Sequence, residues 1–171
     1  NPKRVRMFSD QLRFMMREAD QLVDELIVRY HPMASDLRII KSCLKISYDF
    51  NRIGRYALDI SEMRSILGDH RCGLRHSRKM YNLVAQMVNE AGRAFILEDL
   101  ELARRILSLD EEVDKLYYEY LGKIIREKQS SNPICVILET LVLRHLERIA
   151  DHACYIAETV IYMKSGYYEH E

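Results

Sequence analysis

Four acidic residues are spaced so that they can act together. Asp110 and Asp114 stand four positions apart in the stretch DEEVD, and Glu147 and Asp151 repeat this spacing in ERIAD. Side chains four positions apart share one face of a helix, where like charges repel by about 0.2–0.5 kcal/mol. A bound cation would remove this repulsion, and carboxylate oxygens are suitable ligands for Mg, Mn, Fe or Zn.

The elements that must position these acids are helices. Glycine and proline are scarce, tryptophan is absent, and apolar residues recur at spacings of three and four. The pattern predicts helices over about 4–30, 34–66, 76–96, 100–128 and 133–165. We expect Asp99 and Asn132 to be N-caps, Pro133 to occupy the first position of the last helix, and Gly166 to be its C-cap. Strand alternation is not seen in the sequence, so the fold class is all-α.

The last two predicted helices form an antiparallel hairpin around residues 130–131. Residues at one level of such a hairpin have numbers that add to a constant. Asp110 with Asp151 and Asp114 with Glu147 give the same sum, so the four carboxylates are predicted to meet at one level of an antiparallel bundle.

Two interpretations of this acidic cluster are open. Besides a metal site, it is compatible with a solvated acidic face, because Arg144 and Arg148 can partly neutralise the acids of their own helix. The ExxH motif of ferritin-like di-iron bundles does not accompany the acids. We therefore expect His145 and His152 to be packed, hydrogen-bonded residues and not ligands.

Charge and cysteine content narrow the class of protein. Basic and acidic residues number 26 each, so the net charge gives no reason to expect a nucleic-acid partner. The sequence has neither a signal-peptide core nor an apolar run of the roughly 18 residues that span a bilayer. We expect a soluble cytoplasmic protein without direct membrane insertion. Lacking CxxC spacing, all four cysteines are interpreted as reduced thiols: Cys43, Cys72, Cys135 and Cys154.

Several longer stretches resemble one family. LERIADHACYIAETVIYMKSG resembles the signature of the PhoU family, regulators associated with phosphate-specific ABC transporters. HPMASDLRIIKSCLKISYDFNRIGRYALDISE is similar to that family's first repeat, and with DLELARRILSLDEEVDKLY the resemblance covers nearly the whole chain. It implies a PhoU-like antiparallel bundle of two tandem three-helix repeats. The first would occupy residues 1–70 and the second residues 74–165, followed by a C-terminal tail at 166–171.

The resemblance also implies a metal site, because several members bind iron or zinc clusters through pairs of (E/D)xxxD motifs. In the second repeat the matching positions are the same four carboxylates, Asp110, Asp114, Glu147 and Asp151. In the first repeat they are Ser9, Arg13, Asn51 and Arg55, so every expected ligand is missing there. We expect an iron or zinc cluster, with Mg or Mn as alternatives, in the second repeat only.

The arginines of the first repeat have two interpretations. Arg55 is four residues from Asp59 and is expected near the level of Asp10, so an ion-pair lattice can fill the space of the metal. Alternatively, Arg13, Arg52 and Arg55 form a basic patch that docks an acidic partner.

The beginning of the chain departs from the family pattern. The counterpart of the helix at 76–96 would, in the first repeat, lie before residue 1, and the chain starts with Asn instead of Met. We therefore expect a fragment in which the first helix of repeat one is missing. Its absence would leave Met7, Phe14 and Met15 short of full cover, so a homodimer is expected.

The functional hypothesis is a non-enzymatic adaptor between a phosphate ABC transporter ATPase and a sensor histidine kinase. Both partners come from the family resemblance. The sequence offers neither a nucleophile–base constellation nor a phosphate-binding Gly-rich loop. The alternative hypothesis is a metal-dependent hydrolase or redox enzyme that uses the carboxylate cluster.

Overall fold

The computed structural model describes residues 1–66, 72–126 and 132–167, and over these residues the fold is all-helical. The helices are α1 (Pro2–Tyr30), α2 (Ser35–Ile66), α3 (Arg75–Leu97), α4 (Leu100–Arg126) and α5 (Pro133–Ser165). These bounds confirm the helices predicted from hydrophobic periodicity. Residues 72–74 are non-helical, as the predicted break at 67–73 requires, while its first part at 67–71, the predicted break at 129–131 and most of the tail at 166–171 lie outside the described residues.

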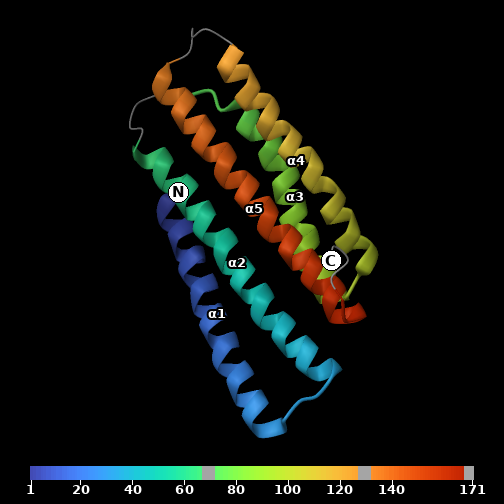
Figure 1. The fold of residues 1–171 in the computed structure, drawn as a ribbon. Coiled ribbons are helices and arrows are strands. Elements are labelled where there is room, and N and C mark those ends of the chain that lie inside the picture. Colours follow the sequence, from blue (N-terminus) through green and yellow to red (C-terminus); the bar gives the residue numbers. More distant parts are fainter. Residues whose placement is uncertain (67–71, 127–131, 168–171) are drawn as a thin grey trace.

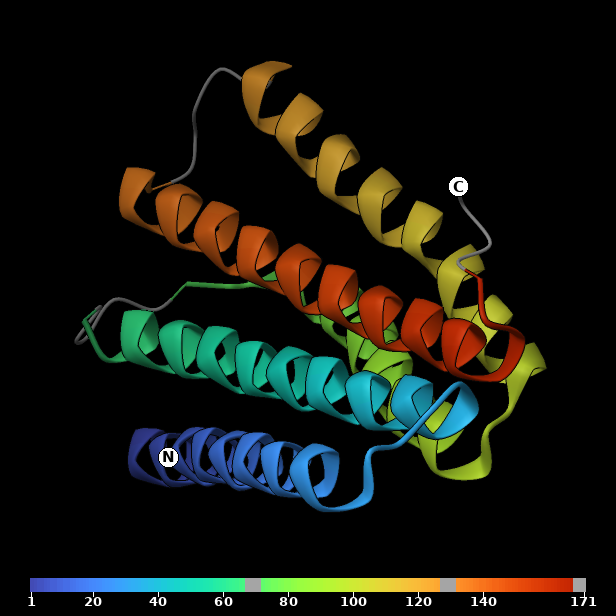
Figure 2. The same ribbon diagram turned by 60° about the horizontal axis from the view of Figure 1, so that its bottom comes forward.

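Helix α5 is the centre of the bundle. It packs against α2, α3 and α4, while α3 also packs on α4 and α1 packs on α2. Figures 1 and 2 show α5 between α2 and α4, with α1 on the outer side of α2. The molecule thus consists of an α1–α2 hairpin and an α3–α4–α5 bundle that meet where α2 packs on α5.

The sequence of α5 explains this central position. Its apolar residues surround the helix, unlike the single apolar stripe of a surface helix. Ile156 and Val160 are fully buried, as are Ala150, Ala153 and Ala157, whose small side chains let neighbouring helices approach. Burying an Ile or Val side chain is worth roughly 1.5–3 kcal/mol. The long apolar helix can therefore support packing on several sides at once.

The helix caps confirm the local predictions. The Asn132 side chain accepts a hydrogen bond from the Ile134 amide at 3.0 Å, and Pro133 follows it at the start of α5. Gly166 ends that helix with φ 89°, a left-handed conformation that glycine adopts without steric cost. Asp99 accepts from the Leu102 amide at 3.0 Å at the start of α4. Short-range sequence signals fix these helix ends.

The cysteine prediction was half wrong. Cys72 and Cys135 form a disulfide, with their Cα atoms 5.3 Å apart and 63 positions between them in the sequence. Absence of CxxC spacing did not exclude it, because the two cysteines lie at the same end of the bundle, just before α3 and in the first turn of α5. Cys43 and Cys154 are free thiols, as predicted.

Part of the apolar surface of α1 faces solvent. Met7 is 50% exposed, Phe14 62% and Met15 63%, in agreement with the expected incomplete cover of this helix. These residues border an open groove of about 870 Å³ together with Lys3 and Arg6. Within the described ranges, none of the helices combines the length and apolarity required to cross a membrane.

The contact between α1 and α2 depends on a glycine. A Cβ at Gly54 would lie 2.6 Å from Leu12 Cδ1, whereas at Gly92 it would make an ordinary contact of 3.7 Å with Phe50. Alanine in place of either helical glycine gains about 0.5–1 kcal/mol of helix propensity. At position 54 the Leu12 side chain must shift away from the new Cβ, and overpacking of this kind costs roughly 1–2 kcal/mol.

We expect Gly92→Ala to stabilise the protein and Gly54→Ala to be less stable than Gly92→Ala by about 1–2 kcal/mol. Urea unfolding followed by circular dichroism measures both variants under the same conditions. An equal gain in the two variants would show that the Gly54 contact does not limit the approach of α1 to α2.

Candidate metal centre

The four predicted ligands come from two adjacent helices. Asp110 and Asp114 lie on α4, Glu147 and Asp151 lie on α5, and α4 packs directly on α5. The charges of Asp114 and Asp151 both act on Asp110, and those of Asp151 and Asp114 both act on Glu147. The structure therefore brings the two i,i+4 pairs near each other, as the hairpin register predicts.

Burial and mutual repulsion raise the pKa of two of these carboxyls, Asp110 and Glu147. Burial raises the pKa of Asp110 above its ordinary value, and the neighbouring charges of Asp114 and Asp151 raise it further. A hydrogen bond with the Cys154 thiol acts in the opposite direction. Burial likewise raises the pKa of Glu147, and the charge of Asp151 adds to it. The metal-free site thus carries unfavourable negative charge at neutral pH.

Two arginines offset part of this charge. Arg144 Nη1 lies 2.6 Å from Glu147 Oε1, and Arg148 Nη1 lies 3.2 Å from Asp151 Oδ2. Both contacts confirm the expected pairing within α5. The other Glu147 oxygen, Oε2, is buried without a hydrogen-bond partner, with Arg148 Nε 3.9 Å away. A buried anionic oxygen without a partner costs free energy, which a bound cation would recover.

The donor atoms of this cluster suit a cation, but their side chains are not positioned to bind one together. The available donors are carboxylate oxygens, which suit Mg, Mn, Fe or Zn, and one of them lacks a partner. Over the ranges that the structure describes, three or more His, Cys, Asp or Glu side chains do not stand close enough together to hold a metal. Ligation by Asp110, Asp114, Glu147 and Asp151 would therefore require their side chains to turn toward a common point.

Neutralising one acid tests the repulsion directly. Because the folded-state pKa of Asp110 is raised, the folded protein retains this proton at pH values where the unfolded chain has lost it. The free energy of unfolding therefore falls as pH rises from the ordinary value near 4 through the raised one. We expect Asp110→Asn to stabilise metal-free protein at pH 7 by about 0.5–1 kcal/mol, discounted for solvent screening, and to lose this advantage below about pH 4.

Urea unfolding of chelator-treated protein at the two pH values measures this effect. Glu111→Gln is the matched control, since Glu111 is exposed on the same helix and should change stability by less than about 0.5 kcal/mol. Equal stability of wild type and Asp110→Asn at pH 7 would contradict the proposed repulsion.

The two histidines of α5 pack against neighbouring helices, as predicted. Only His152 has a hydrogen-bond partner at Nδ1, whereas the prediction expected both to be hydrogen-bonded. His152 Nδ1 lies 2.7 Å from Asp49 Oδ1 on α2, and both residues are buried. Because a carboxylate only accepts, the imidazole nitrogen donates. His145 packs against Tyr56, its Nδ1 lacks a partner, and burial lowers its pKa. Sequence reasoning missed Asp49, which has no distinguishing motif.

Helices α1 and α2 carry ion pairs at the positions that were expected to match the carboxylates of α4 and α5. Arg55 Nε lies 3.4 Å from Asp59 Oδ1, and Arg13 binds Asp10 on its own helix. Arg52 donates to the Tyr56 hydroxyl at 2.6 Å and lies over its ring. These partners favour the ion-pair interpretation over a free basic patch. The pairs run along single helices, so the predicted link from Arg55 to Asp10 is replaced by two separate contacts.

Comparison with known proteins identifies the family. The PhoU domain family matches residues 3–63 and 77–160. A Thermotoga maritima protein named phosphate-specific transport system accessory protein PhoU homolog 1 is 31% identical over 96% of this chain and 73% of its own length. The similarly named Pseudomonas aeruginosa homolog is 35% identical over 96% of this chain and 70% of its own length.

Solved structures of PhoU proteins have the same fold as this chain. A crystal structure of PhoU from Pseudomonas aeruginosa superposes with a TM-score of 0.86 at 34% identity, covering 97% of this chain and 82% of that one. The phosphate transport system regulatory protein PhoU from Streptococcus pneumoniae has the same fold, with a TM-score of 0.87 over 98% of this chain and 80% of that one at 22% identity. On these matches, this all-helical chain belongs to the PhoU family.

Proposed function

We propose that this protein is an accessory regulator of phosphate uptake and phosphate-starvation signalling. The observation that carries this proposal is the 35% identity, over 96% of the chain, to a protein named as an accessory of a phosphate-specific transport system. The same name applies to the Thermotoga maritima relative at 31% identity. An accessory role requires binding surfaces and not a catalytic centre.

The proposed partners are the ATPase of a phosphate ABC transporter and a sensor histidine kinase, both contacted in the cytoplasm. Support for the first partner comes from the transport system in the relatives' names. Affinity-tagged protein should recover the ATPase or the kinase from cells grown at high phosphate. Captured material that contains neither partner would count against the adaptor hypothesis.

We also propose that the protein assembles as a homodimer or a higher oligomer. The apolar side chains Met7, Phe14 and Met15 are each at least half exposed on α1 and would be buried by a second copy. The balance of 26 basic and 26 acidic residues gives no support for nucleic acid as a partner. Light scattering that finds only monomer at micromolar concentration would contradict the dimer.

The proposed metal site lies in the second repeat, with Asp110, Asp114, Glu147 and Asp151 as ligands. Iron or zinc is the proposed occupant, and Mg or Mn is the alternative. A bound cation there would supply positive charge that relieves repulsion between α4 and α5. The support is the raised pKa of Asp110 and Glu147 and the unpartnered Glu147 Oε2. These acids would then hold the two helices together.

The same carboxylates gave the competing hypothesis of a metal-dependent hydrolase or redox enzyme. We propose a non-enzymatic role, because the relatives at 31% and 35% identity are named as accessory proteins of a transport system. Metal-loaded protein is expected to show no phosphatase or peroxidase turnover above the metal alone. Turnover that Asp114→Ala abolishes would favour the enzyme instead.

A further inference from the structure

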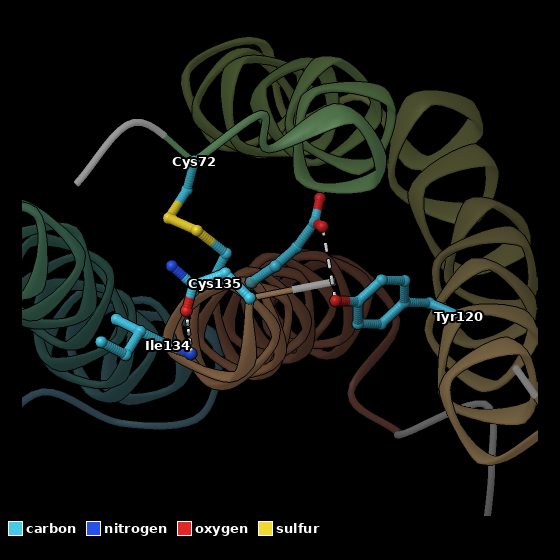
Figure 3. Close-up of a disulfide and its surroundings, with 6 residues drawn as sticks. Cys72, Tyr120, Ile134 and Cys135 are labelled. Atoms are coloured by element: carbon cyan, nitrogen blue, oxygen red, sulfur yellow. Dashed lines mark hydrogen bonds between the residues drawn. A yellow bond between two sulfur atoms is a disulfide. The ribbon is translucent and has the colours of Figure 1, made fainter. Parts of the chain in front are cut away.

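The disulfide holds two helix ends together. Cys72 lies just before α3 and Cys135 lies in the first turn of α5, so the bond encloses α3 and α4 in one covalent loop. Figure 3 shows the bond between these two segments, with Tyr120 of α4 on the other side of α5. Both cysteines are only partly buried. A small thiol or disulfide can therefore reach the bond from solvent.

A buried glutamate holds the same end of α3 without a covalent bond. Glu139, one turn after Cys135, accepts hydrogen bonds from the amides of His76 at 2.9 Å and Ser77 at 3.2 Å. Leu74, at the N-cap position of α3, provides no side-chain cap, so this carboxylate from α5 replaces it. Because α3 depends on a distant residue for its cap, its first turn is sensitive to the position of α5.

Tyr120 connects α4 to the contact between Glu139 and the first turn of α3. Its hydroxyl donates to Glu139 Oε2 at 3.3 Å, which links α4 to the capped end of α3 (Figure 3). Burial, followed by the negative charge of Glu139, raises the pKa of Tyr120 to about 12. The phenol thus stays protonated and continues to donate throughout the neutral range.

The positions of the four cysteines favour thiol–disulfide exchange at Cys72 and Cys135. Cys135 lies in the first turn of α5, where the helix dipole stabilises a thiolate. Burial raises the pKa of the free thiol Cys43, and the free thiol Cys154 is buried in the core, out of reach of solvent reagents. Exchange is therefore disfavoured at the two free cysteines, which leaves the partly exposed pair Cys72 and Cys135 as the site of exchange.

We propose that Cys72 and Cys135 form a reversible thiol–disulfide switch that controls how firmly the first turn of α3 is held on α5. The oxidant is a small-molecule disulfide of the glutathione class. Cys135 thiolate attacks it to form a mixed disulfide and release one glutathione thiolate. Cys72 thiolate then attacks Cys135 Sγ and releases the second. Two protein thiols are oxidised and one glutathione disulfide is reduced to two glutathione thiols. The two protons lost by Cys72 and Cys135 pass to the two departing glutathione thiolates, so no proton is released overall.

The first test counts thiols on the full chain after equilibration with reduced and oxidised glutathione, followed by acid quenching, unfolding and alkylation. Mass spectrometry should find two alkylated cysteines, Cys43 and Cys154, in the oxidised protein and four after reduction. The Cys43→Ala variant should keep the same transition with one thiol fewer. Four thiols under fully oxidised glutathione, or a mixed disulfide on Cys135 that persists without closing to the Cys72–Cys135 bond, would overturn the proposal.

The second test measures how firmly the first turn of α3 is held, by hydrogen exchange at the amides of His76 and Ser77. Reduction of the wild type should speed their exchange at least about tenfold and lower the melting temperature by about 5–10 °C. Cys72→Ser combined with Cys135→Ser should resemble the reduced wild type and show no further response to reductant. Identical exchange at these two amides in oxidised and reduced wild type would overturn the switch, even if the thiol counts change.

Discussion

Protein that carries both Asp110→Asn and Asp151→Asn is expected to bind no stoichiometric iron or zinc. The two substitutions remove one anionic ligand from α4 and one from α5, and neutral amides are poor ligands for these cations. Loss of supporting groups around a metal commonly costs 10–100-fold in affinity, so losing two direct ligands should cost more than about 100-fold. Elemental analysis of purified protein and titration with each metal measure the effect.

Two controls separate ligand loss from unfolding and locate the metal. The double variant should remain folded and gain stability without metal, because repulsion between the carboxylates falls. Arg55→Asp should leave the metal content unchanged, since Arg13 still brings positive charge to the first repeat and arginine keeps its proton. Anomalous scattering from iron- or zinc-soaked crystals should give a peak at the second repeat. A strong peak between Arg13 and Arg55 would refute the assignment.

Asp49→Ala should cause the largest loss of stability among the substitutions considered. Asp49 and His152 are both buried where α2 packs on α5, and their hydrogen bond is 2.7 Å long. Removing the carboxylate leaves the buried imidazole N–H without an acceptor, which costs about 1–3 kcal/mol, or more for a hydrogen bond to a charged group. That is a large part of the roughly 5–15 kcal/mol of a typical domain. Urea unfolding at pH 7 measures the change in the free energy of unfolding.

Two further variants distinguish a lost hydrogen bond from lost packing. Asp49→Asn keeps the side-chain size and an acceptor oxygen, so it should cost less than Asp49→Ala. Arg55→Ala breaks the largely exposed pair with Asp59 and should cost at most about 1 kcal/mol. If Asp49→Ala is no more destabilising than Arg55→Ala, the buried pair does not stabilise the contact between α2 and α5.

Local sequence signals were sufficient to predict most of the backbone. Hydrophobic periodicity located the helices, and Asn132 and Gly166 marked the ends of α5 because caps depend on residues within one turn. The register of the hairpin followed from the position of its turn, and it placed Asp110 beside Asp151. These predictions succeeded because each depends on residues close together in the chain or joined by a short connection.

Contacts between distant helices could not be predicted in the same way. The pair of Asp49 with His152 joins residues 103 positions apart, and Glu139 caps a helix that begins 64 positions earlier, so pattern and spacing contain no signal for either. The disulfide was missed for the same reason, since its two cysteines meet only after α3, α4 and α5 have packed. Such contacts depend on helix tilt and rotation, which periodicity does not specify.

The central position of α5 also bears on how the protein opens under native conditions. Among the described residues, α1 packs on α2 alone, and the α1–α2 hairpin reaches the rest of the fold where α2 meets α5. The α3–α4–α5 bundle, by contrast, has contacts between every pair of its helices and a covalent link. Regions with fewer internal contacts open at lower free energy and act as separate cooperative units. Helix α1, which packs on α2 alone, can thus open at lower free energy than α2, which is also packed extensively on α5. The face of α2 that α1 covers would then be the first part of the interior that a protease can reach.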